Sequence, residues 1–372
     1  MRSAGWPLAL IFITIFFGPS DASAGQFRGA VYDRAGPRPY QVIATHLTNS
    51  GNIDLVVANL PSSEVFILLG EGDGTFQKPS KFSAIKPIAV AAGDFNGDGN
   101  QDLLVVEAGG RSKSAIAIFL GDGKGNFHKS AEYVSGLETT AVAVGDFNGD
   151  GFLDAAVANY GGGTVNVFFG DGKGRLGTPS TYKVKQPFHI AAADLNGDHH
   201  SDLAVAQGGI LGVAVLLNDG TGKFGKPVSY SIGNGGALDV QIADLRNNGN
   251  QDLVVANWEQ GMTVLLNEGN GTFGKQETYV PDCHCDAPFA CVVADFNLDN
   301  KPDVACTTWQ GESYLFYGNG AGKFPTSAPI YENIQNDGAY SLAAGDFNND
   351  NAPDLAFAIE LSGKVAIMLN TK

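Results

Sequence analysis

One nine-residue phrase recurs along most of the chain at a nearly constant interval. Its clearest copies read DFNGDGNQD from Asp94 to Asp102 and DFNGDGFLD from Asp146 to Asp154. Related copies begin at Asp194, Asp244, Asp295 and Asp346, and a degenerate copy runs from His46 to Asp54. Successive copies start 48, 52, 48, 50, 51 and 51 residues apart. Repeats of this length are typical of solenoids and propellers, in which one repeat cannot bury its apolar face alone.

Each repeat contains four short strand-like segments joined by tight connections. In the second repeat they are residues 88–93, 102–106 and 115–120 and a segment that ends near Tyr133. A glycine-rich turn precedes the fourth segment, and no helix follows it, so a hairpin turn fits better than a nucleotide-binding loop. No segment shows a sustained 3.6-residue apolar period. The sequence therefore predicts an all-β, seven-bladed β-propeller of four-stranded blades.

The two ends of the chain predict export and ring closure. Arg2, an apolar run over residues 8–17 and the small-residue motif at Ala22 to Ala24 are typical of a secretory signal peptide over residues 1–24. The alternative is a buried N-terminal strand. Residues 25–372 then form a single domain, which we expect to be secreted, extracellular or periplasmic, and monomeric, with no membrane span.

The last repeat stops after its third strand-like segment, residues 365–370. Residues 26–33, at the start of the mature chain, are expected to supply the missing outer strand by pairing with the strand that ends at Leu369. A ring sealed in this way covers the edge that the third strand of the last blade would otherwise expose.

The recurring phrase has the spacing of a calcium loop. Carboxylates or amides at positions one, three and five, a backbone carbonyl at position seven and an Asp at position nine converge on one hard cation. An EF-hand is excluded because its flanking helices and its Glu at position twelve are missing. The alternative is a set of Asx-turns without metal. Position six holds a residue that tolerates a left-handed turn in every copy: Gly51, Gly99, Gly151, His199, Gly249, Asn300 and Asn351.

Two of the seven loops depart from the pattern. Loop five has Arg246 and Asn248 at positions three and five, so the guanidinium is a candidate replacement for the cation. Loop one has His46, Thr48 and Ser50 and keeps only Asp54. We therefore expect about five calcium ions, and none in these two loops.

The acidity of the chain belongs largely to these loops. The net charge is −16, and 18 of the 39 acidic residues lie in the seven phrases. Nucleic-acid binding needs basic stripes, so this charge argues against a nucleic-acid partner.

The repeated motif, Asp-Phe-Asn-Gly-Asp-Gly-x-x-Asp-Leu with a following Val-Ala-Asn, closely resembles the FG-GAP or VCBS-type repeats of the integrin α-subunit head and of many secreted bacterial proteins. The resemblance covers nearly all of residues 25–372. It implies a seven-bladed β-propeller with calcium in the hairpin between the first two strands of a blade. It also implies these ligand sets: Asp94, Asn96, Asp98, Asn100 and Asp102; Asp146, Asn148, Asp150, Phe152 and Asp154; Asp194, Asn196, Asp198, His200 and Asp202; Asp295, Asn297, Asp299, Lys301 and Asp303; Asp346, Asn348, Asp350, Ala352 and Asp354.

Four cysteines, Cys283, Cys285, Cys291 and Cys306, lie in the sixth repeat. Cys291 and Cys306 fall on adjacent predicted strands, where they either form a disulfide or sit as small core residues. Cys283-His-Cys285 lacks the usual zinc spacing, and export favours disulfides. The sequence does not choose among the three possible pairings.

The expected ligand surface is the propeller face opposite the calcium loops. There the connections between second and third strands carry Asn59, Glu107, Asn159, Gln207 and Asn257 in register. Tyr160, Trp258 and Trp309 lie in the same connections, and aromatic rings beside amides and carboxylates suit sugar or protein recognition. The candidate ligand-binding residues are Asn159, Tyr160, Asn257, Trp258 and Trp309; the alternative is that these rings fill the space between blades.

No Gly-x-Ser-x-Gly or His-Glu-x-x-His motif is present, and the six histidines are scattered. The sequence therefore favours a non-catalytic, lectin-like or adhesion module that binds a glycan or an extracellular protein. A calcium-dependent polysaccharide lyase and a structural cell-surface component remain the alternatives.

Overall fold

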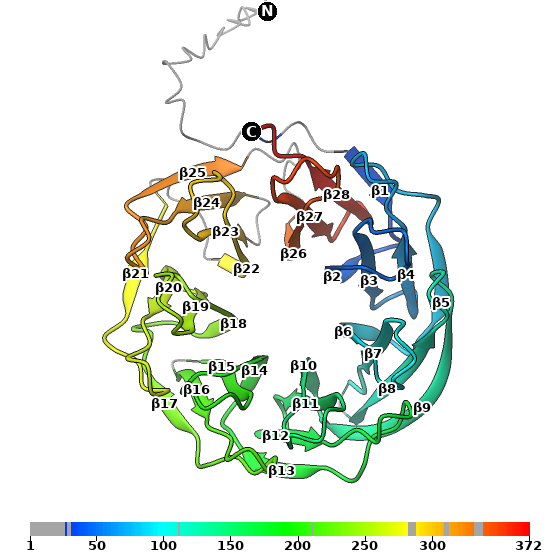
Figure 1. Ribbon diagram of the computed structural model, residues 1–372, viewed down its shortest axis with the longest axis horizontal. Helices are drawn as coiled ribbons and strands as arrows, with labels where there is room; N and C mark the ends of the chain where they lie inside the picture. Colours follow the sequence, from blue (N-terminus) through cyan, green and yellow to red (C-terminus); the bar gives the residue numbers. More distant parts are fainter. Residues whose placement is uncertain are drawn as a thin grey trace, which may run out of the picture.

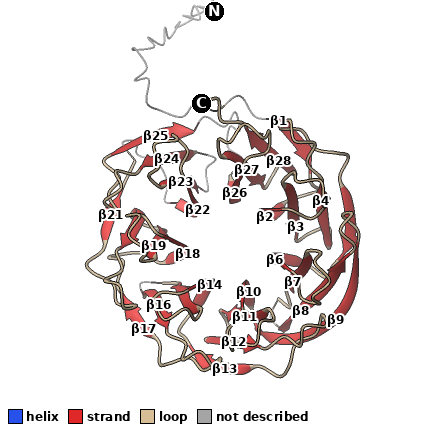
Figure 2. Cartoon of the chain, in the orientation of Figure 1, coloured by secondary structure: helices blue, strands red, loops and turns tan. Residues whose placement is uncertain are grey.

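The protein is a closed ring of seven small sheets. The computed structural model describes Phe27 and residues 31–110, 112–209, 211–281, 288–308, 312–330 and 338–372. Over these residues the chain forms 28 strands and no helix, and the strands make seven four-stranded sheets around a central axis (Figures 1 and 2). The predicted all-β, seven-bladed propeller is confirmed. Within the same ranges there is consequently no helix of the length and apolarity that a membrane span requires. The proposed signal peptide, residues 1–24, lies outside them.

Every blade is an antiparallel sheet whose strands follow one another outward from the axis. We number the blades and their loops one to seven. The strands are, in blade one, β2 (Pro39–Thr45), β3 (Asp54–Asn59), β4 (Glu64–Leu68) and β5 (Ser80–Ser83); in blade two, β6 (Pro87–Gly93), β7 (Asp102–Glu107), β8 (Lys113–Gly121) and β9 (Phe127–Leu137); in blade three, β10 (Thr139–Gly145), β11 (Asp154–Asn159), β12 (Thr164–Phe168) and β13 (Ser180–Lys183); in blade four, β14 (Pro187–Ala193), β15 (Asp202–Gln207), β16 (Gly212–Leu216) and β17 (Val228–Tyr230); in blade five, β18 (Ala237–Ala243), β19 (Asp252–Asn257), β20 (Gly261–Leu265) and β21 (Glu277–Tyr279); in blade six, β22 (Pro288–Ala294), β23 (Asp303–Thr308), β24 (Ser313–Tyr317) and β25 (Thr326–Ile330); and in blade seven, β26 (Ala339–Gly345), β27 (Asp354–Ile359), β28 (Lys364–Met368) and β1 (Val31–Arg34).

The last blade is completed by the first strand of the chain. Strand β1 pairs antiparallel with β28, with Val31 opposite Ile367 and Arg34 opposite Lys364. Phe27 adds an isolated bridge to Asn370. The predicted ring closure is confirmed, although the strand proper covers residues 31–34 rather than the expected 26–33. The two ends of the sequence are therefore held together by backbone hydrogen bonds in blade seven.

The hydrophobic core is divided among the junctions between blades. The cluster between blades three and four, for example, joins Phe147 and Val165 of one blade to Leu203 and Leu216 of the next. Equivalent clusters fill the other junctions of the described residues. The second strand of every blade is completely buried. Because a single four-stranded sheet buries little by itself, each blade depends on both neighbours for its stability.

Blade six contains a disulfide between its first two strands. Cys291 of β22 lies directly opposite Cys306 of β23, and the two form a disulfide with both side chains buried. This settles the choice that the sequence left open for these two cysteines. Cys283 and Cys285 lie outside the described residues.

Candidate functional site

Six of the recurring loops, two to seven, are left-handed at positions four and six, whereas loop one keeps only the left-handed position six that the sequence predicted. Position six is left-handed throughout, including His199 (φ 69°), Asn300 (φ 62°) and Asn351 (φ 68°). In loop two, Asp94 holds the turn because its Oδ1 accepts from the backbone N–H of Gly97 at 2.7 Å and its Oδ2 from Gly99 at 2.8 Å. Asp244 accepts from Gly249 in the same way at 2.6 Å, although loop five is not expected to bind calcium. The backbone shape of the loop is thus separate from its metal-binding capacity.

The Asp at position nine has a structural role that the metal prediction did not include. Asp102 is completely buried; its Oδ2 accepts from the N–H of Phe95 at 2.9 Å and its Oδ1 from Gly121 at 2.8 Å. It therefore joins the start of the loop to the turn after the third strand. The same pair of bonds is made by Asp54, Asp154, Asp202 and Asp354. The sequence carried this signal, because Asp54 is the one acidic residue that loop one retains.

Five loops carry three carboxylates each, near enough for the charges of two to affect the pKa of the third. Burial raises the pKa of Asp154 to about 6, against hydrogen bonds from Gly170 and Phe147, and the charges of Asp150 and Asp146 add to the rise. The pKa of the equivalent aspartates is likewise about 6 in loops four, six and seven (Asp202, Asp303 and Asp354). Burial raises the pKa of Asp102 in loop two, again with the help of two carboxylates. These are the loops expected to bind calcium, and a divalent cation would relieve the repulsion in each.

Loop one lacks this accumulation of charge. Burial raises the pKa of Asp54 as well, but its hydrogen bonds and the nearby His46 oppose the rise.

In the part of the chain that the structure describes, no three imidazole, thiolate or carboxylate groups are close enough to form a ready-made metal site. In the expected ligand sets an amide at position three and a carbonyl at position seven complement the carboxylates.

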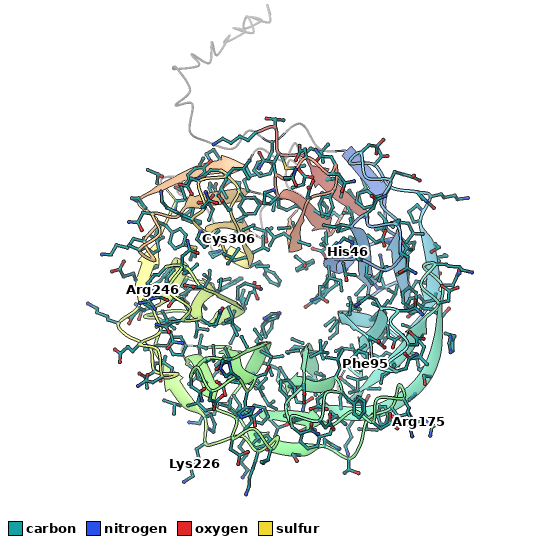
Figure 3. All side chains as sticks on the ribbon, viewed as in Figure 1. His46, Phe95, Arg175, Lys226, Arg246 and Cys306 are labelled. Atoms are coloured by element: carbon teal, nitrogen blue, oxygen red, sulfur yellow. A yellow bond between two sulfur atoms is a disulfide. The ribbon has the colours of Figure 1, made fainter. Side chains whose placement is uncertain are left out.

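In loop five an arginine, Arg246, contacts the buried Asp at position nine, and Figure 3 labels it in blade five. Arg246 donates through Nε to Asp252 Oδ2 at 3.1 Å and through an Nη atom to Asp252 Oδ1 at 2.7 Å. The same Nη atom reaches the carbonyl of Asn267 at 2.6 Å. The guanidinium thereby replaces the position-two N–H that bonds to Oδ2 in other loops, and it adds a positive charge, while Oδ1 still accepts from the N–H of Asn267. That it takes the place of a calcium ion stays a prediction.

The carbonyl at position two links each of the five acidic loops to the next blade. Asn218 donates its side-chain amide to Phe147 O at 2.7 Å, and Asn267 and Asn370 reach Leu195 O and Phe296 O at 2.7 and 2.8 Å. In the two remaining cases a backbone N–H is the donor: Gly174 to Phe95 O at 2.8 Å and Gly74 to Phe347 O at 2.9 Å. The acidic loops are therefore part of the blade junctions.

On the opposite face, the polar residues at the ends of the second strands are buried, which corrects the expectation that they face a ligand. Asn159 is fully buried and its amide oxygen accepts from Thr139 Oγ1 at 2.6 Å. Asn257, equally buried, donates to the carbonyl of Ile232 at 3.0 Å. Asn59 and Gln207 likewise donate to Ala35 O and Lys185 O, and the Glu107 carboxylate accepts from the N–H of Ile85. These side chains hold the connection that leads in from the preceding outer strand.

The aromatic residues of these connections have different environments. Trp258 is 50% exposed and remains available to a ligand. Tyr160 is half-buried, with its ring edge against Phe188 of the next blade at 6.0 Å between centroids. Trp309 lies outside the described residues. The same face also exposes four apolar side chains that the sequence analysis did not single out: Ile85, Leu137, Val280 and Leu361.

The chain belongs to the FG-GAP-like repeat family. The model of this family matches six overlapping segments, residues 46–105, 94–157, 146–205, 194–255, 244–306 and 295–357. Each match spans two consecutive loops, so the family assignment rests on the same phrase that fixes the fold. A search of curated proteins found no match to the sequence.

Solved structures with this architecture differ widely in sequence. An Agrocybe aegerita lectin, solved to explain its specific recognition of non-reducing terminal N-acetylglucosamine, is 20% identical with a TM-score of 0.56 over 89% of this chain and 85% of its own. BBS1N, solved in complex with ARL6DN, is 17% identical with a TM-score of 0.64 over 93% and 97%. Saccharomyces cerevisiae Sqt1 is 10% identical with a TM-score of 0.61 over 94% and 99%. At these identities the likeness concerns the fold alone.

Proposed function

We propose that the protein is an exported, calcium-stabilised module that binds glycans without cleaving them. The observation that carries this proposal is the difference between the two faces. One face holds the acidic loops, whose side chains are committed to turns and blade junctions. The other exposes Trp258, Ile85, Leu137, Val280 and Leu361, whereas the exposed large apolar side chains of the loop face are Phe152 and Leu298. Exposed aromatic and apolar groups on a face with few carboxylates are typical of a binding surface.

The similar fold of a lectin supports the glycan assignment, because a β-propeller of this kind serves there to recognise a sugar. Fold alone does not determine function, so the assignment depends on the surface residues of this chain. A protein partner is the second candidate. It is favoured by the exposed Ile85, Leu137, Val280 and Leu361 and by the similar BBS1N propeller, which was solved in a complex with ARL6DN.

Calcium would be held in loops two, three, four, six and seven. In loop two the oxygens of Asp94, Asn96, Asp98 and Asp102 and the carbonyl of Asn100 would hold it. The bound ion would supply positive charge to three mutually repelling carboxylates. Since the same loops are bonded to the next blade through their position-two carbonyls, calcium would stabilise the junctions as well.

Matched substitutions test the metal assignment. Asp98→Ala removes a position-five carboxylate from an acidic loop, whereas Asp244→Ala removes the first Asp from the loop that Arg246 occupies. Metal analysis is expected to give about five equivalents for the unaltered protein. It should give about one equivalent less for Asp98→Ala and an unchanged content for Asp244→Ala. Two equivalents or fewer for the unaltered protein would contradict the assignment.

A glycan-array screen of the mature protein, with and without a chelator, tests the function. We expect binding of intact glycans that weakens when calcium is removed, with no release of unsaturated ends that absorb ultraviolet light. Release of such ends would identify a polysaccharide lyase. Absence of glycan binding in both conditions would reject the glycan assignment and leave the protein-partner candidate.

A further inference from the structure

The innermost strands of all seven blades enclose a central channel with a cavity of about 540 Å³. Residues of β2, β6, β10, β14, β18, β22 and β26 line it, and Figure 3 shows side chains that project from these strands into the central opening. The volume is in the range of small-molecule binding sites. Because the ring is closed by strand pairing, a ligand can enter only along the axis. A chain-like ligand must therefore present one of its ends.

The second residue of each innermost strand forms a bulky collar around the channel, at the end toward the exposed Trp258. Four of these seven residues are aromatic, and all four side chains are half-buried. Tyr40 and Tyr340 stack with ring centroids 5.2 Å apart, and Phe289 meets Tyr340 edge-on at 5.2 Å. Phe188 is held by Tyr160 from outside the channel. The full collar consists of Tyr40, Ile88, Thr140, Phe188, Leu238, Phe289 and Tyr340.

A belt of polar side chains follows directly below the collar. Asp239 of β18 is nearly buried, and its Oδ2 accepts from the N–H of Cys291 at 2.8 Å. Gln241 donates to Asp239 at 3.0 Å. His189 of β14 places Nδ1 3.0 Å from Asp239 Oδ1, an ionic contact rather than an aligned hydrogen bond. On the other side, Gln41 uses its oxygen to accept from Val90 at 2.6 Å, which leaves its amide N–H groups as donors toward the cavity.

The charge balance of the channel favours a neutral ligand. Among the described residues that line it, His189 and Asp239 are the groups able to carry charge near neutral pH, and they are paired with each other. An anion would meet the Asp239 carboxylate without an unpaired cation to receive it. A cation would compete with His189 for a carboxylate that already accepts three contacts. A neutral ring with hydroxyl groups fits both layers, because its apolar face can lie on the collar while its hydroxyls donate to and accept from the belt.

We infer that the channel at the collar binds the terminal residue of a neutral glycan, which enters end-on with its ring against the collar and its hydroxyls toward Gln41 and Gln241. The inference rests on the proposed glycan-binding function and gives it a ligand class, a stoichiometry of one per chain and a location in the channel, whose mouth lies on the face that exposes Trp258.

Calorimetric titration of the calcium-loaded mature protein with methyl glycosides of galactose, mannose and N-acetylglucosamine tests the inference. At least one is expected to bind with one site per chain, and glucuronic acid more weakly than its neutral counterpart. Ala91→Trp places a large ring in the channel from half-buried Ala91, at the level of Gln241, and should abolish binding. Phe188→Ala removes a collar ring and should weaken affinity about 10-fold. Val228→Ala, at an exposed side chain of the outer strand β17, is the matched control and should bind normally.

Several results would overturn the inference. One is unchanged affinity in both Ala91→Trp and Phe188→Ala, provided that their melting temperatures stay near that of the unaltered protein. Another is loss of binding in Trp258→Ala alone, which would place the site on the rim. Several equivalent sites per chain would indicate binding between blades. If longer glycans bind on an array but no simple neutral glycoside does, the channel site is rejected and the glycan-binding function stands. If no glycan binds at all, both are rejected.

Discussion

Loop five allows the calcium hypothesis to be tested by exchanging one cation for another. Arg246 occupies position three of this loop and Asn248 position five, whereas the acidic loops have Asn and Asp there. The double substitution Arg246→Asn with Asn248→Asp gives the loop the pattern DLNNDGNQD. Its formal charge then falls from −1 to −3, the value of loop two. We predict that this variant loses stability without calcium and binds one additional calcium ion.

The cost of removing the arginine follows from its contacts. Arg246 is 23% exposed, but its partner Asp252 is completely buried. Removing one partner of a buried ion pair costs about 3–5 kcal/mol, because it leaves a buried charge without compensation. Asp252 keeps the N–H of Asn267 at 2.8 Å, so we expect the lower end of that range, about 3 kcal/mol. The carbonyl of Asn267 also loses its side-chain donor.

Calcium should reverse most of this loss in the double variant only. At a free concentration one hundred times the dissociation constant, a bound ligand stabilises the folded state by about 2.7 kcal/mol. Arg246→Asn alone has two carboxylates in the loop and is expected to gain no ion. Metal analysis and urea unfolding, each with and without calcium, measure the two effects. Arg175→Asn, at an exposed arginine outside the loops, is the control for loss of a positive charge.

Two results would refute this reasoning. If Arg246→Asn unfolds at the same urea concentration as the unaltered protein, the guanidinium does not stabilise loop five. If the double variant folds and yet binds no additional calcium, the residue pattern is not sufficient to create a site. The residue pattern of the five acidic loops would then no longer support calcium binding there.

Three further predictions follow from other contacts. Asn218→Ala leaves the carbonyls of Phe147 and Ser201 without a buried donor and should cost about 1–3 kcal/mol in urea unfolding, whereas exposed Lys226→Ala should cost almost nothing. Burial alone would lower the pKa of His189, but the neighbouring Asp239 carboxylate raises it overall. Burial alone would raise the pKa of Asp239, but His189 lowers it overall. The contribution of His189 to the free energy of unfolding is therefore fully present below about pH 6.5 and is lost as the pH rises through its folded-state pKa. The contribution of Asp239 is lost as the pH falls below about 4. His189→Gln should remove the alkaline loss between pH 6 and 9, and an unchanged melting profile there would contradict this. Trp258→Ala should leave the melting temperature within about 2 °C, because half of the ring is exposed, and a larger drop would mean that the ring holds blades together.

The fold could be predicted because one short phrase determines it repeatedly. The left-handed position six and the apolar run after position nine recur in every repeat, so loop shape and second strand are encoded locally. Loop five shows that this encoding survives loss of the metal ligands, since Asp244 still holds the turn. The missing outer strand at the end of the chain then left the first residues as its only replacement within the predicted ring, and β1 fills that place.

The orientation of Asn159 and Asn257 could not be predicted in the same way. A polar residue repeated in register at the end of a strand has the same pattern whether it faces solvent or a buried carbonyl. What decides is the partner that the fold supplies. Ile232 O reaches Asn257 from the segment between two blades, about which the spacing within a repeat contains no information. Asn159 bonds to Thr139, which lies opposite it on β10 of the same blade. The channel collar was missed for a similar reason, because Tyr40, Phe188, Phe289 and Tyr340 adjoin only after the ring has closed.

The contacts at the two ends of each junction suggest how the calcium loops influence the opposite face. At one end the position-two carbonyl of an acidic loop binds the turn of the next blade, as Phe147 O binds Asn218. At the other end the last residue of a second strand binds the connection from the preceding blade, as Asn257 binds Ile232 O. The second strand between them is fully buried and cannot bend without opening the apolar cluster around it. Calcium bound in the acidic loops would thus fix the spacing of the innermost strands, and with it the distance between collar residues of neighbouring blades. Chelation is accordingly expected to weaken a ligand that needs several collar rings more than one that contacts Trp258 alone.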